Sequence, residues 1–381
     1  MKHPLFQRLT RIKQLGLTNV VYPGAQHTRF QHSLGAFHLT SEAILSLTQK
    51  GVFIFESEAE AVQAAILMHD IGHGPFSHVL ENTLIHGISH EEMSLMMMNE
   101  INHDLGDNLT LAIKIFKDEY PKRFLHQLIS SQLDMDRLDY LRRDSFFTGV
   151  TEGNIGSARI IKMLNVVDDN LVVDSKGIYS IENYLTSRRL MYWQVYLHKT
   201  TVGYEKLLVN LLSRAKYLAD QGETLFATPA LHFFLYNHID KEAFVDNAEP
   251  LQHYKMLDDS DIWASVKAWT THRDPILSLL SRNLIDRRIF KVEVRSTAVE
   301  EAEVMDIRHQ IAQRYGLSFD DTAYLVNVST IRKDMYDIHD DHISILYKDG
   351  TIKDITEASE ILNISLLSKK ICKYYLCYQR F

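Results

Sequence analysis

An apolar stretch that ends in ionisable residues places the strongest constraint on how this chain can fold. Residues 64–78 read AAILMHDIGHGPFSH, so that side chains typical of the buried face of a helix lead directly into His69 and Asp70. Two more histidines, His73 and His78, follow at once. Burying a charge is unfavourable unless the charge is paired or binds a metal ion. The stretch therefore predicts that a partner from elsewhere in the chain, or a bound ion, meets this pair in the interior.

Composition and charge narrow the class of protein. The chain has 381 residues, of which 45% are hydrophobic and 24% charged, as in an ordinary folded protein. Its apolar runs are far shorter than the ~20 residues of a membrane helix, and the start MKHPLFQRL lacks the apolar core of a signal peptide. We therefore expect a cytoplasmic protein without membrane attachment. The formal charge of −8 argues against a general polyanion-binding surface, so any phosphate site must be a local concentration of cations.

Periodicity predicts a mainly α protein. Apolar residues recur at helical spacing through about the first 220 residues, for example at Leu34, Phe37, Ile44 and Leu47. We predict a helical domain over residues 1–222, a helical connecting region over 223–287 and a smaller α+β region over 288–381. The expected strands are a hairpin within 170–181 and segments at 289–294, 323–328, 343–355 (turning at Asp349-Gly350) and 374–379.

Four residues could together hold a metal ion. His32 lies in HTRFQHSLG, His69 and Asp70 end the apolar stretch, and Asp136 lies in LDMDRLDYLRRD, all within predicted helices. Two imidazoles and two carboxylates suit one divalent ion, such as manganese, iron, nickel, zinc or magnesium, with room left for water and phosphate. Taken singly, an interior histidine is more often a hydrogen-bonded core residue, and Asp136 could form ion pairs within its own helix.

Five blocks of the sequence resemble, in order and with compatible spacing, the motifs of HD-domain metal-dependent phosphohydrolases, specifically the deoxynucleoside triphosphate triphosphohydrolase (dGTPase-like) branch. The blocks are FQRLTRIKQLG, YPGAQHTRFQHSLG, MHDIGHGPFSH, HEEMS and LDMDRLDYLRRD, and the match runs from about Pro4 to Lys199. A lone His-Asp pair would be weak evidence, whereas five ordered blocks are specific. The resemblance implies an HD-domain helical bundle in which His32, His69, Asp70 and Asp136 hold the metal ion.

The resemblance also implies a catalytic set of histidines, His73, His78 and His90. An imidazole titrates near neutrality, so it can pass a proton to a departing oxygen at cellular pH. His90 follows Ser89, which with Glu92 forms the sequence pattern of a capping box, so His90 begins a predicted helix. At such a position it could alternatively be an ordinary surface residue.

Substrate contacts are implied in the same way. Cationic residues would bind the triphosphate and polar or aromatic residues the sugar: Arg29, Arg137, Arg188 and Lys199 for the phosphates, Tyr196 against the sugar ring, and Gln14, Tyr140 and Asp144 near the 3′-hydroxyl. Guanidinium groups match phosphate oxygens bidentately, although a single arginine on a helix is usually only solvated. The family has a polar residue where this chain has Leu197, so the resemblance gives no base preference.

The function predicted from the sequence is metal-dependent hydrolysis of deoxynucleoside triphosphates to deoxynucleoside and triphosphate, by a homo-oligomer, either a dimer or a tetramer. Two alternatives stay open. An HD-type phosphodiesterase or nucleotidase would share the metal ligands without needing Arg188, Tyr196 and Lys199. A regulator that binds nucleotides or single-stranded nucleic acid would keep the HD site only as structure, and the acidic net charge counts against nucleic acid.

Overall fold

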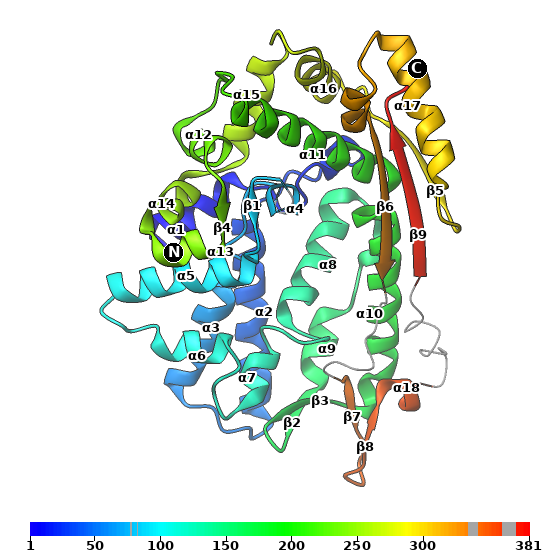
Figure 1. Cartoon of the computed structure of the whole chain (residues 1–381). Helices are drawn as coiled ribbons and strands as arrows, with labels where there is room; N and C mark the ends of the chain where they lie inside the picture. Colours follow the sequence, from blue (N-terminus) through cyan, green and yellow to red (C-terminus); the bar gives the residue numbers. More distant parts are fainter. Residues whose placement is uncertain (77, 82, 334–341, 360–370) are drawn as a thin grey trace.

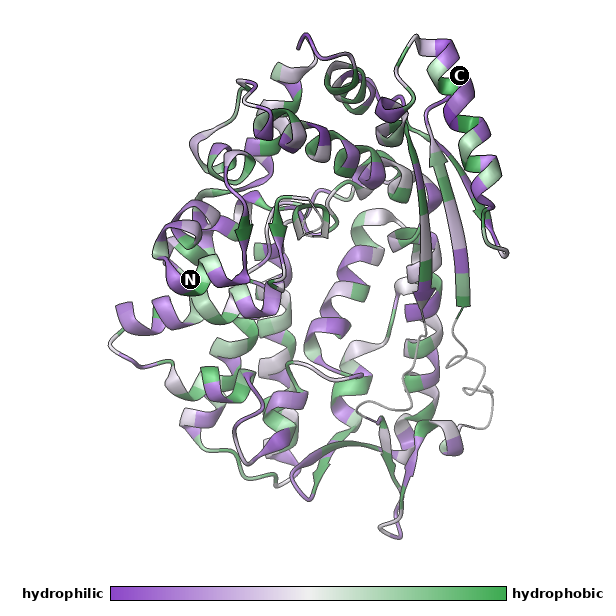
Figure 2. Ribbon diagram, viewed as in Figure 1, coloured by the Kyte–Doolittle hydropathy of each residue, from purple (hydrophilic) through white to green (hydrophobic). Residues whose placement is uncertain are grey.

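Helices make up most of the computed structural model, which describes residues 1–76, 78–81, 83–333, 342–359 and 371–381 (Figure 1). They enclose two hydrophobic cores, and three small sheets accompany them among these residues. The long helices carry hydrophobic and hydrophilic residues side by side, as amphipathic helices do (Figure 2). The prediction of a mainly α protein with a smaller C-terminal α+β part is confirmed.

The first core lies among the helices that follow the N-terminal segment. Its helices are α2 (Arg29–Gln49), α3 (Glu56–Met68), α6 (Thr110–Phe116), α7 (Arg123–Gln127), α8 (Met135–Thr148), α9 (Ser157–Met163), α10 (Ile178–Met191) and α18 (Ile355–Ala358). Helix α2 packs on both α3 and α8. A Cβ atom at Gly35 of α2 would lie 2.0 Å from Asp139 Oδ1 of α8, so a larger residue at this position would displace the Asp139 side chain.

The second core joins the two ends of the chain. Its helices are α1 (Pro4–Gln7), α4 (His78–Glu81), α5 (His90–Asp104), α11 (Lys199–Asp220), α12 (Pro229–Tyr236), α13 (Lys241–Asp246), α14 (Ala248–Met256), α15 (Asp259–Trp269), α16 (Pro275–Ile285) and α17 (Glu301–Tyr315). Leu5, Leu207, Trp269 and Leu376 all belong to it, so it draws on each of the three predicted regions. The boundaries at 222 and 287 stay a prediction.

The sheets agree with the strands expected at the C-terminal end. Strand β9 (Ile371–Tyr378) pairs antiparallel with β5 (Lys291–Arg295) on one side and β6 (Val326–Lys333) on the other. Strands β7 (Ser344–Leu346) and β8 (Ile352–Asp354) form the hairpin expected at Asp349-Gly350, where Gly350 has a φ of +87°. A short parallel pair, β1 (Ile85–His86) and β4 (Ile239–Asp240), lies in the second core.

The prediction of a hairpin within residues 170–181 is wrong about which segment pairs with the first strand. Strand β3 (Asn170–Asp174) is present, but it pairs antiparallel with the preceding β2 (Leu164–Val167), and α10 already begins at Ile178. The connecting residues Asp168 and Asp169 both have positive φ, 48° and 57°. Aspartate tolerates this left-handed conformation better than most residues, which is why the chain turns there.

Short helical turns complete the chain: η1 (Arg8–Arg11), η2 (Thr18–Val20), η3 (Thr151–Gly153), η4 (Ser175–Gly177), η5 (Tyr192–Tyr196) and η6 (Asp320–Leu325). Across the described ranges, no helix combines the length and the apolar character that crossing a membrane would require.

Asp259 attaches the N-terminal segment to α15. Its Oδ2 accepts a hydrogen bond of 3.1 Å from the Lys13 main-chain N–H. Its Oδ1 is buried and has no hydrogen-bond partner among the described residues. Burial raises the pKa of Asp259 to about 6, because the lost hydration outweighs the stabilisation by Lys13. The ionised carboxylate is therefore unfavourable in the folded protein.

We expect Asp259→Asn to stabilise the protein at about pH 8 much more than at about pH 4. The folded state holds the Asp259 proton more tightly than the unfolded state, so wild type loses stability as the pH rises from about 4 to about 6. A pKa raised to about 6 corresponds to a loss of about 3 kcal/mol above that pH. Asparagine keeps an oxygen for the Lys13 N–H and carries no charge.

Urea unfolding at the two pH values measures this effect. Asp306→Asn, on the exposed side of α17, is the control and should change the free energy of unfolding equally little at both. A stabilisation by Asp259→Asn that is the same at both pH values would contradict the expectation.

Candidate functional site

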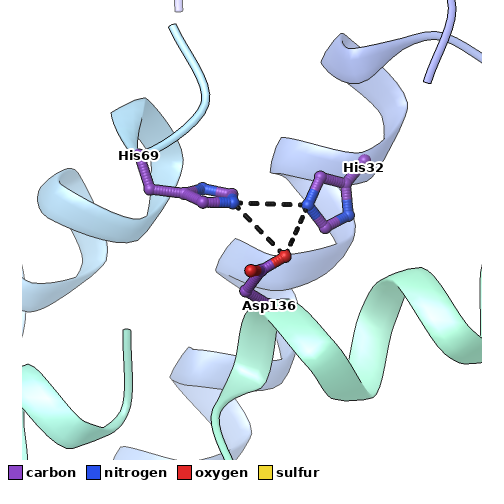
Figure 3. A group of neighbouring side chains, drawn as sticks. All are labelled: His32, His69 and Asp136. Carbon is purple, nitrogen blue, oxygen red and sulfur yellow. Dashed lines mark hydrogen bonds and ion pairs between the residues drawn. The ribbon is translucent and has the colours of Figure 1, made fainter. Parts of the chain in front are cut away.

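Three of the predicted metal ligands meet at one point between α2, α3 and α8 (Figure 3). His32 lies in α2, His69 directly follows α3, and Asp136 lies in the first turn of α8. Asp136 Oδ1 is 2.9 Å from His32 Nε2 and 3.4 Å from His69 Nε2, and the two Nε2 atoms are 3.3 Å apart. We call these three residues the ligand group.

The second nitrogen of each histidine is held by an acceptor. His32 Nδ1 lies 2.8 Å from Asp139 Oδ2, and His69 Nδ1 lies 2.6 Å from the Ile66 carbonyl oxygen. Because a carboxylate and a carbonyl oxygen only accept, both Nδ1 atoms carry hydrogen when the rings are neutral, and both Nε2 atoms then present lone pairs. Three acceptor atoms then converge without a donor. This donor set fits a divalent metal ion.

Electrostatics favour a cation at this point. Burial lowers the pKa of His32, but without a metal ion its hydrogen bonds with Asp136 and Asp139 outweigh burial and hold that pKa well above its ordinary value, so that a proton on Nε2 takes the position of the ion. Burial raises the pKa of Asp136, but His69 and His32 lower it by more, so the carboxylate is ionised. These shifts show that a positive charge between the three residues is electrostatically favourable.

Asp70, the fourth predicted ligand, lies beside the ligand group. Its Oδ2 is 2.5 Å from Arg29 Nη1, while its Oδ1 is 3.2 Å from His73 Nε2 and 3.5 Å from His69 Nε2. Burial raises the pKa of Asp70, but the surrounding His69 and Arg29 hold it well below its ordinary value. Its carboxylate is ion-paired with Arg29, and its role as a ligand stays a prediction.

The loop that follows α3 is fixed by side chains from three distant segments. Arg8 donates to the carbonyl oxygens of His73 (2.7 Å) and Leu257 (3.1 Å), Tyr254 Oη donates to that of Gly72 (2.7 Å), and Ser94 Oγ donates to that of His69 (2.8 Å). The Arg8 guanidinium is buried and lies over the Tyr254 ring. These bonds fix the backbone that directs His69, Asp70 and His73. We call them the loop clamp.

A cavity of about 540 Å³ opens at the ligand group. This volume lies in the range of small-molecule sites. Nine of the predicted site residues line it: Gln14, Arg29, Asp70, His73, His90, Asp136, Tyr140, Asp144 and Tyr196. Other lining residues, which the sequence does not single out as ligands, include Lys13, Phe76, Tyr192 and Glu205, and Leu197 lies among them.

The predicted catalytic histidines are partly brought together. His73 and His90 stack with their ring centroids 4.0 Å apart. His90 begins α5 behind the predicted capping box, in which the Glu92 N–H donates to Ser89 Oγ. Burial and the charge of Arg29 lower the pKa of His73 to about 3. His78 begins α4, but its side chain lies outside the described part of the structure.

Aromatic residues form the part of the cavity wall that the resemblance assigns to the sugar. Tyr140 and Tyr196 meet edge to face at 6.1 Å. Residues 192–196 form a π-helical turn, in which the Leu197 N–H donates to the Tyr192 carbonyl oxygen at 2.7 Å, five residues back. Such turns often occur at functional sites. Here the turn brings the rings of Tyr192 and Tyr196 within 5.2 Å.

The predicted phosphate-binding cations differ in their surroundings. Arg188 has two buried nitrogen atoms, Nε and Nη1, without a hydrogen-bond partner among the described residues, and its guanidinium lies over the Tyr192 ring. Arg137 instead donates to the Ser131 carbonyl oxygen and lies 3.6 Å from Asp134. Lys199 is exposed at the start of α11. Among the described cavity-lining residues, Arg29 is the one predicted phosphate-binding cation.

Asp139 is a site residue that the sequence does not single out. It orients His32 and is itself held by two hydrogen bonds from Arg143. A signal for it exists in the sequence, because a metal-binding histidine requires an acceptor for its second nitrogen. Asp139 lies one helical turn after Asp136, on the side that α2 approaches at Gly35.

Comparisons with known proteins identify the domain that contains these residues. The HD domain model matches residues 29–144, which include all four predicted metal ligands, and the HD associated region matches residues 155–223. The crystal structure of a phosphohydrolase from Bacteroides thetaiotaomicron has a TM-score of 0.97 at 66% identity, covering 100% of this chain and 94% of that one.

Two curated relatives extend the comparison. The uncharacterized protein YwfO of Bacillus subtilis is 34% identical over 389 residues, covering 98% of this chain and 86% of that protein. The deoxynucleoside triphosphate triphosphohydrolase SAMHD1 homolog of Dictyostelium discoideum is 33% identical over 229 residues, which cover 55% of this chain and 44% of that protein.

We expect Asp136→Ala to abolish metal binding and Asp139→Asn to weaken it by about 10- to 100-fold. The first change removes a ligand atom, whereas the second weakens the acceptor that orients His32. Metal content after dialysis and competition with a chelating dye measure the two effects. Asp306→Ala on α17 is the control. A full equivalent of metal on Asp136→Ala would disprove the assignment.

Proposed function

This chain belongs to the HD-domain phosphohydrolases, and from that premise we propose that it hydrolyses deoxynucleoside triphosphates to a deoxynucleoside and inorganic triphosphate. The proposal rests on one observation above all. A single cavity is lined by Asp136 of the ligand group and also by residues that the resemblance assigns to a deoxyribose, namely Gln14, Tyr140, Asp144 and Tyr196. A phosphodiesterase has no need of this second set.

The phosphate chain would be bound by a metal ion in the ligand group and by arginine side chains. A divalent ion held by His32, His69 and Asp136, with Asp70 beside them, would supply Lewis-acid chemistry at a phosphate oxygen. Arg29 lies on the cavity wall, fixed by Asp70. Arg188 offers two buried nitrogen atoms whose hydrogen-bonding capacity is unused among the described residues. Both guanidinium groups suit phosphate oxygens.

The proposed reaction breaks the bond between the α-phosphorus and the 5′-oxygen of the nucleoside. Water adds its oxygen to the α-phosphorus and gives up a proton, and the departing 5′-oxygen takes up a proton. We assign that donation to His90, whose ring is held in the cavity wall by stacking on His73. An imidazole can exchange a proton at neutral pH. Triphosphate leaves as one piece.

The sugar would be recognised by shape and by hydrogen-bond acceptors. Tyr140 and Tyr196 are bulky groups that would crowd a 2′-hydroxyl, which favours deoxynucleotides over ribonucleotides. Gln14 Oε1 is a buried acceptor without a partner among the described residues, and Asp144 is a buried carboxylate. Either of them could accept the one hydrogen bond that the 3′-hydroxyl donates. The similarity to the Dictyostelium triphosphohydrolase supports the same substrate class.

We expect the protein to convert dATP or dGTP to stoichiometric triphosphate in the presence of manganese, and to act more slowly on ATP. Phosphorus NMR of the first turnovers identifies the product, and a chelator should abolish turnover. A panel that includes a phosphodiester tests the alternative directly. Orthophosphate from the start would indicate attack at the γ-phosphorus, and hydrolysis of the phosphodiester alone would indicate a phosphodiesterase. Binding without any turnover would favour a regulator.

We expect Arg188→Ala to raise KM for dATP by about tenfold or more with little change in kcat. A contact to a phosphate far from the reacting bond is made in ground and transition states alike, and a charged hydrogen bond is worth about 1.5–3 kcal/mol. Arg189→Ala, at the next helical position, is the matched control. An effect confined to kcat would show that Arg188 acts on the transition state instead.

The expected dimer or tetramer stays a prediction. Size-exclusion chromatography with light scattering tests it, with and without dATP and manganese, because a substrate that binds between subunits would shift the distribution.

A further inference from the structure

His27 is a buried histidine outside the ligand group. It lies in the loop before α2 and is 2% exposed. Its ring stacks on Phe147 with centroids 4.5 Å apart, and its Nε2 is 2.7 Å from Asp144 Oδ1. His27 therefore contacts Asp144, which lines the cavity, while His27 itself is not among the lining residues.

The hydrogen-bond directions around Asp144 are determined by its neighbours. Its second oxygen, Oδ2, accepts a hydrogen bond of 2.8 Å from Tyr196 Oη. Burial and the charge of Asp144 hold the pKa of Tyr196 well above its ordinary value, so the hydroxyl keeps its hydrogen. A carboxylate only accepts, so His27 Nε2 is the donor to Oδ1. Both oxygens are thereby fixed, and each retains lone pairs that can accept from a ligand hydroxyl.

The main chain of His27 holds a second cavity residue. Its carbonyl oxygen accepts a hydrogen bond of 3.0 Å from the Gln14 N–H. The Gln14 side chain lines the cavity with Asp144, and its Oε1 is a buried acceptor without a partner among the described residues. One residue thus fixes two acceptors, Asp144 through its ring and Gln14 through its backbone.

We propose that His27 is a positioning residue for recognition of the 3′-hydroxyl, because its imidazole fixes the Asp144 carboxylate, which accepts the hydrogen of this hydroxyl with Gln14 beside it. The inference rests on the proposed function, since it requires a nucleotide sugar in the cavity. Phe147 stacking alone would make His27 an ordinary packing residue, and the two roles differ in one measurable property.

That property is discrimination between a deoxynucleotide and its 3′-deoxy analogue. A substrate without the 3′-hydroxyl lacks the hydrogen bond that this O–H donates to the Asp144 carboxylate, and the loss of a hydrogen bond to a carboxylate lowers kcat/KM by about 10- to 100-fold. Without the His27 donor the carboxylate is free to turn, and both substrates meet a less ordered site. The ratio of kcat/KM for dATP to that for 2′,3′-dideoxyATP therefore reports positioning, whereas a packing defect reduces both values together.

The experiment compares wild type with His27→Gln, His27→Asn and His27→Leu. Glutamine places an amide N–H near the position of Nε2, whereas the shorter asparagine amide does not reach Asp144, and leucine fills the space without a donor. His126→Ala is the control, because His126 of α7 is a half-buried histidine that hydrogen-bonds the Ile115 carbonyl oxygen and is not one of the residues that line the cavity. Thermal denaturation establishes which variants are folded.

We expect wild type, His27→Gln and His126→Ala to share a ratio of about tenfold or more, and His27→Asn and His27→Leu to lower it at least severalfold. If His27→Leu does not fold, the comparison of His27→Gln with His27→Asn is sufficient, since both side chains end in an amide and only the glutamine amide reaches Asp144. A ratio unchanged in His27→Asn, with dATP still hydrolysed, overturns the role of His27 while leaving the proposed function intact. No turnover of dATP by wild type overturns both.

Discussion

Three electron-pair donor atoms held within 3.4 Å of one another form the constraint on which the rest of this structure depends. The lone pairs of His32 Nε2, His69 Nε2 and Asp136 Oδ1 repel one another unless a proton or a metal ion lies between them. They can be kept this close only by a rigid frame. Gly35 provides it by letting α2 approach α8, and Asp139 provides it by fixing the His32 ring.

The cavity lies where the two hydrophobic cores meet. Phe76 and Val79 of its lining belong to the second core, whereas Tyr140 and Tyr196 pack against the first. The helices of the first core therefore carry the ligand group, and the second core contributes part of the cavity wall. The loop after α3 connects them, because Arg8 and Tyr254 bond its backbone beside the second core, while His69 contacts Asp136 of α8, a helix of the first core.

The sequence predicts those parts of the site that have a local pattern. His69 and Asp70 stand out because they end an apolar helix, and the C-terminal strands because their residues alternate around recognisable turns. The pairing of Asp70 with Arg29 has no such signal, since only the fold decides which partner a carboxylate meets. His27 and Asp139 are missed for the same reason: each bonds a residue more than 100 positions away, Asp144 and His32 respectively. The hairpin at β2 and β3 is missed because two aspartates, and no glycine, take the positive φ values.

The loop clamp has a consequence for the order in which the protein matures. Arg8 bonds the carbonyl oxygen of Leu257, 249 residues further along the chain. During synthesis, the first core can begin to pack once α10 has emerged, but the backbone behind His69 and His73 stays incompletely fixed until α14 and the residue after it have been made. Contacts of such long sequence separation form late. The backbone that directs His69 and His73 is therefore complete only when Arg8 and the segment at Leu257 are both in place.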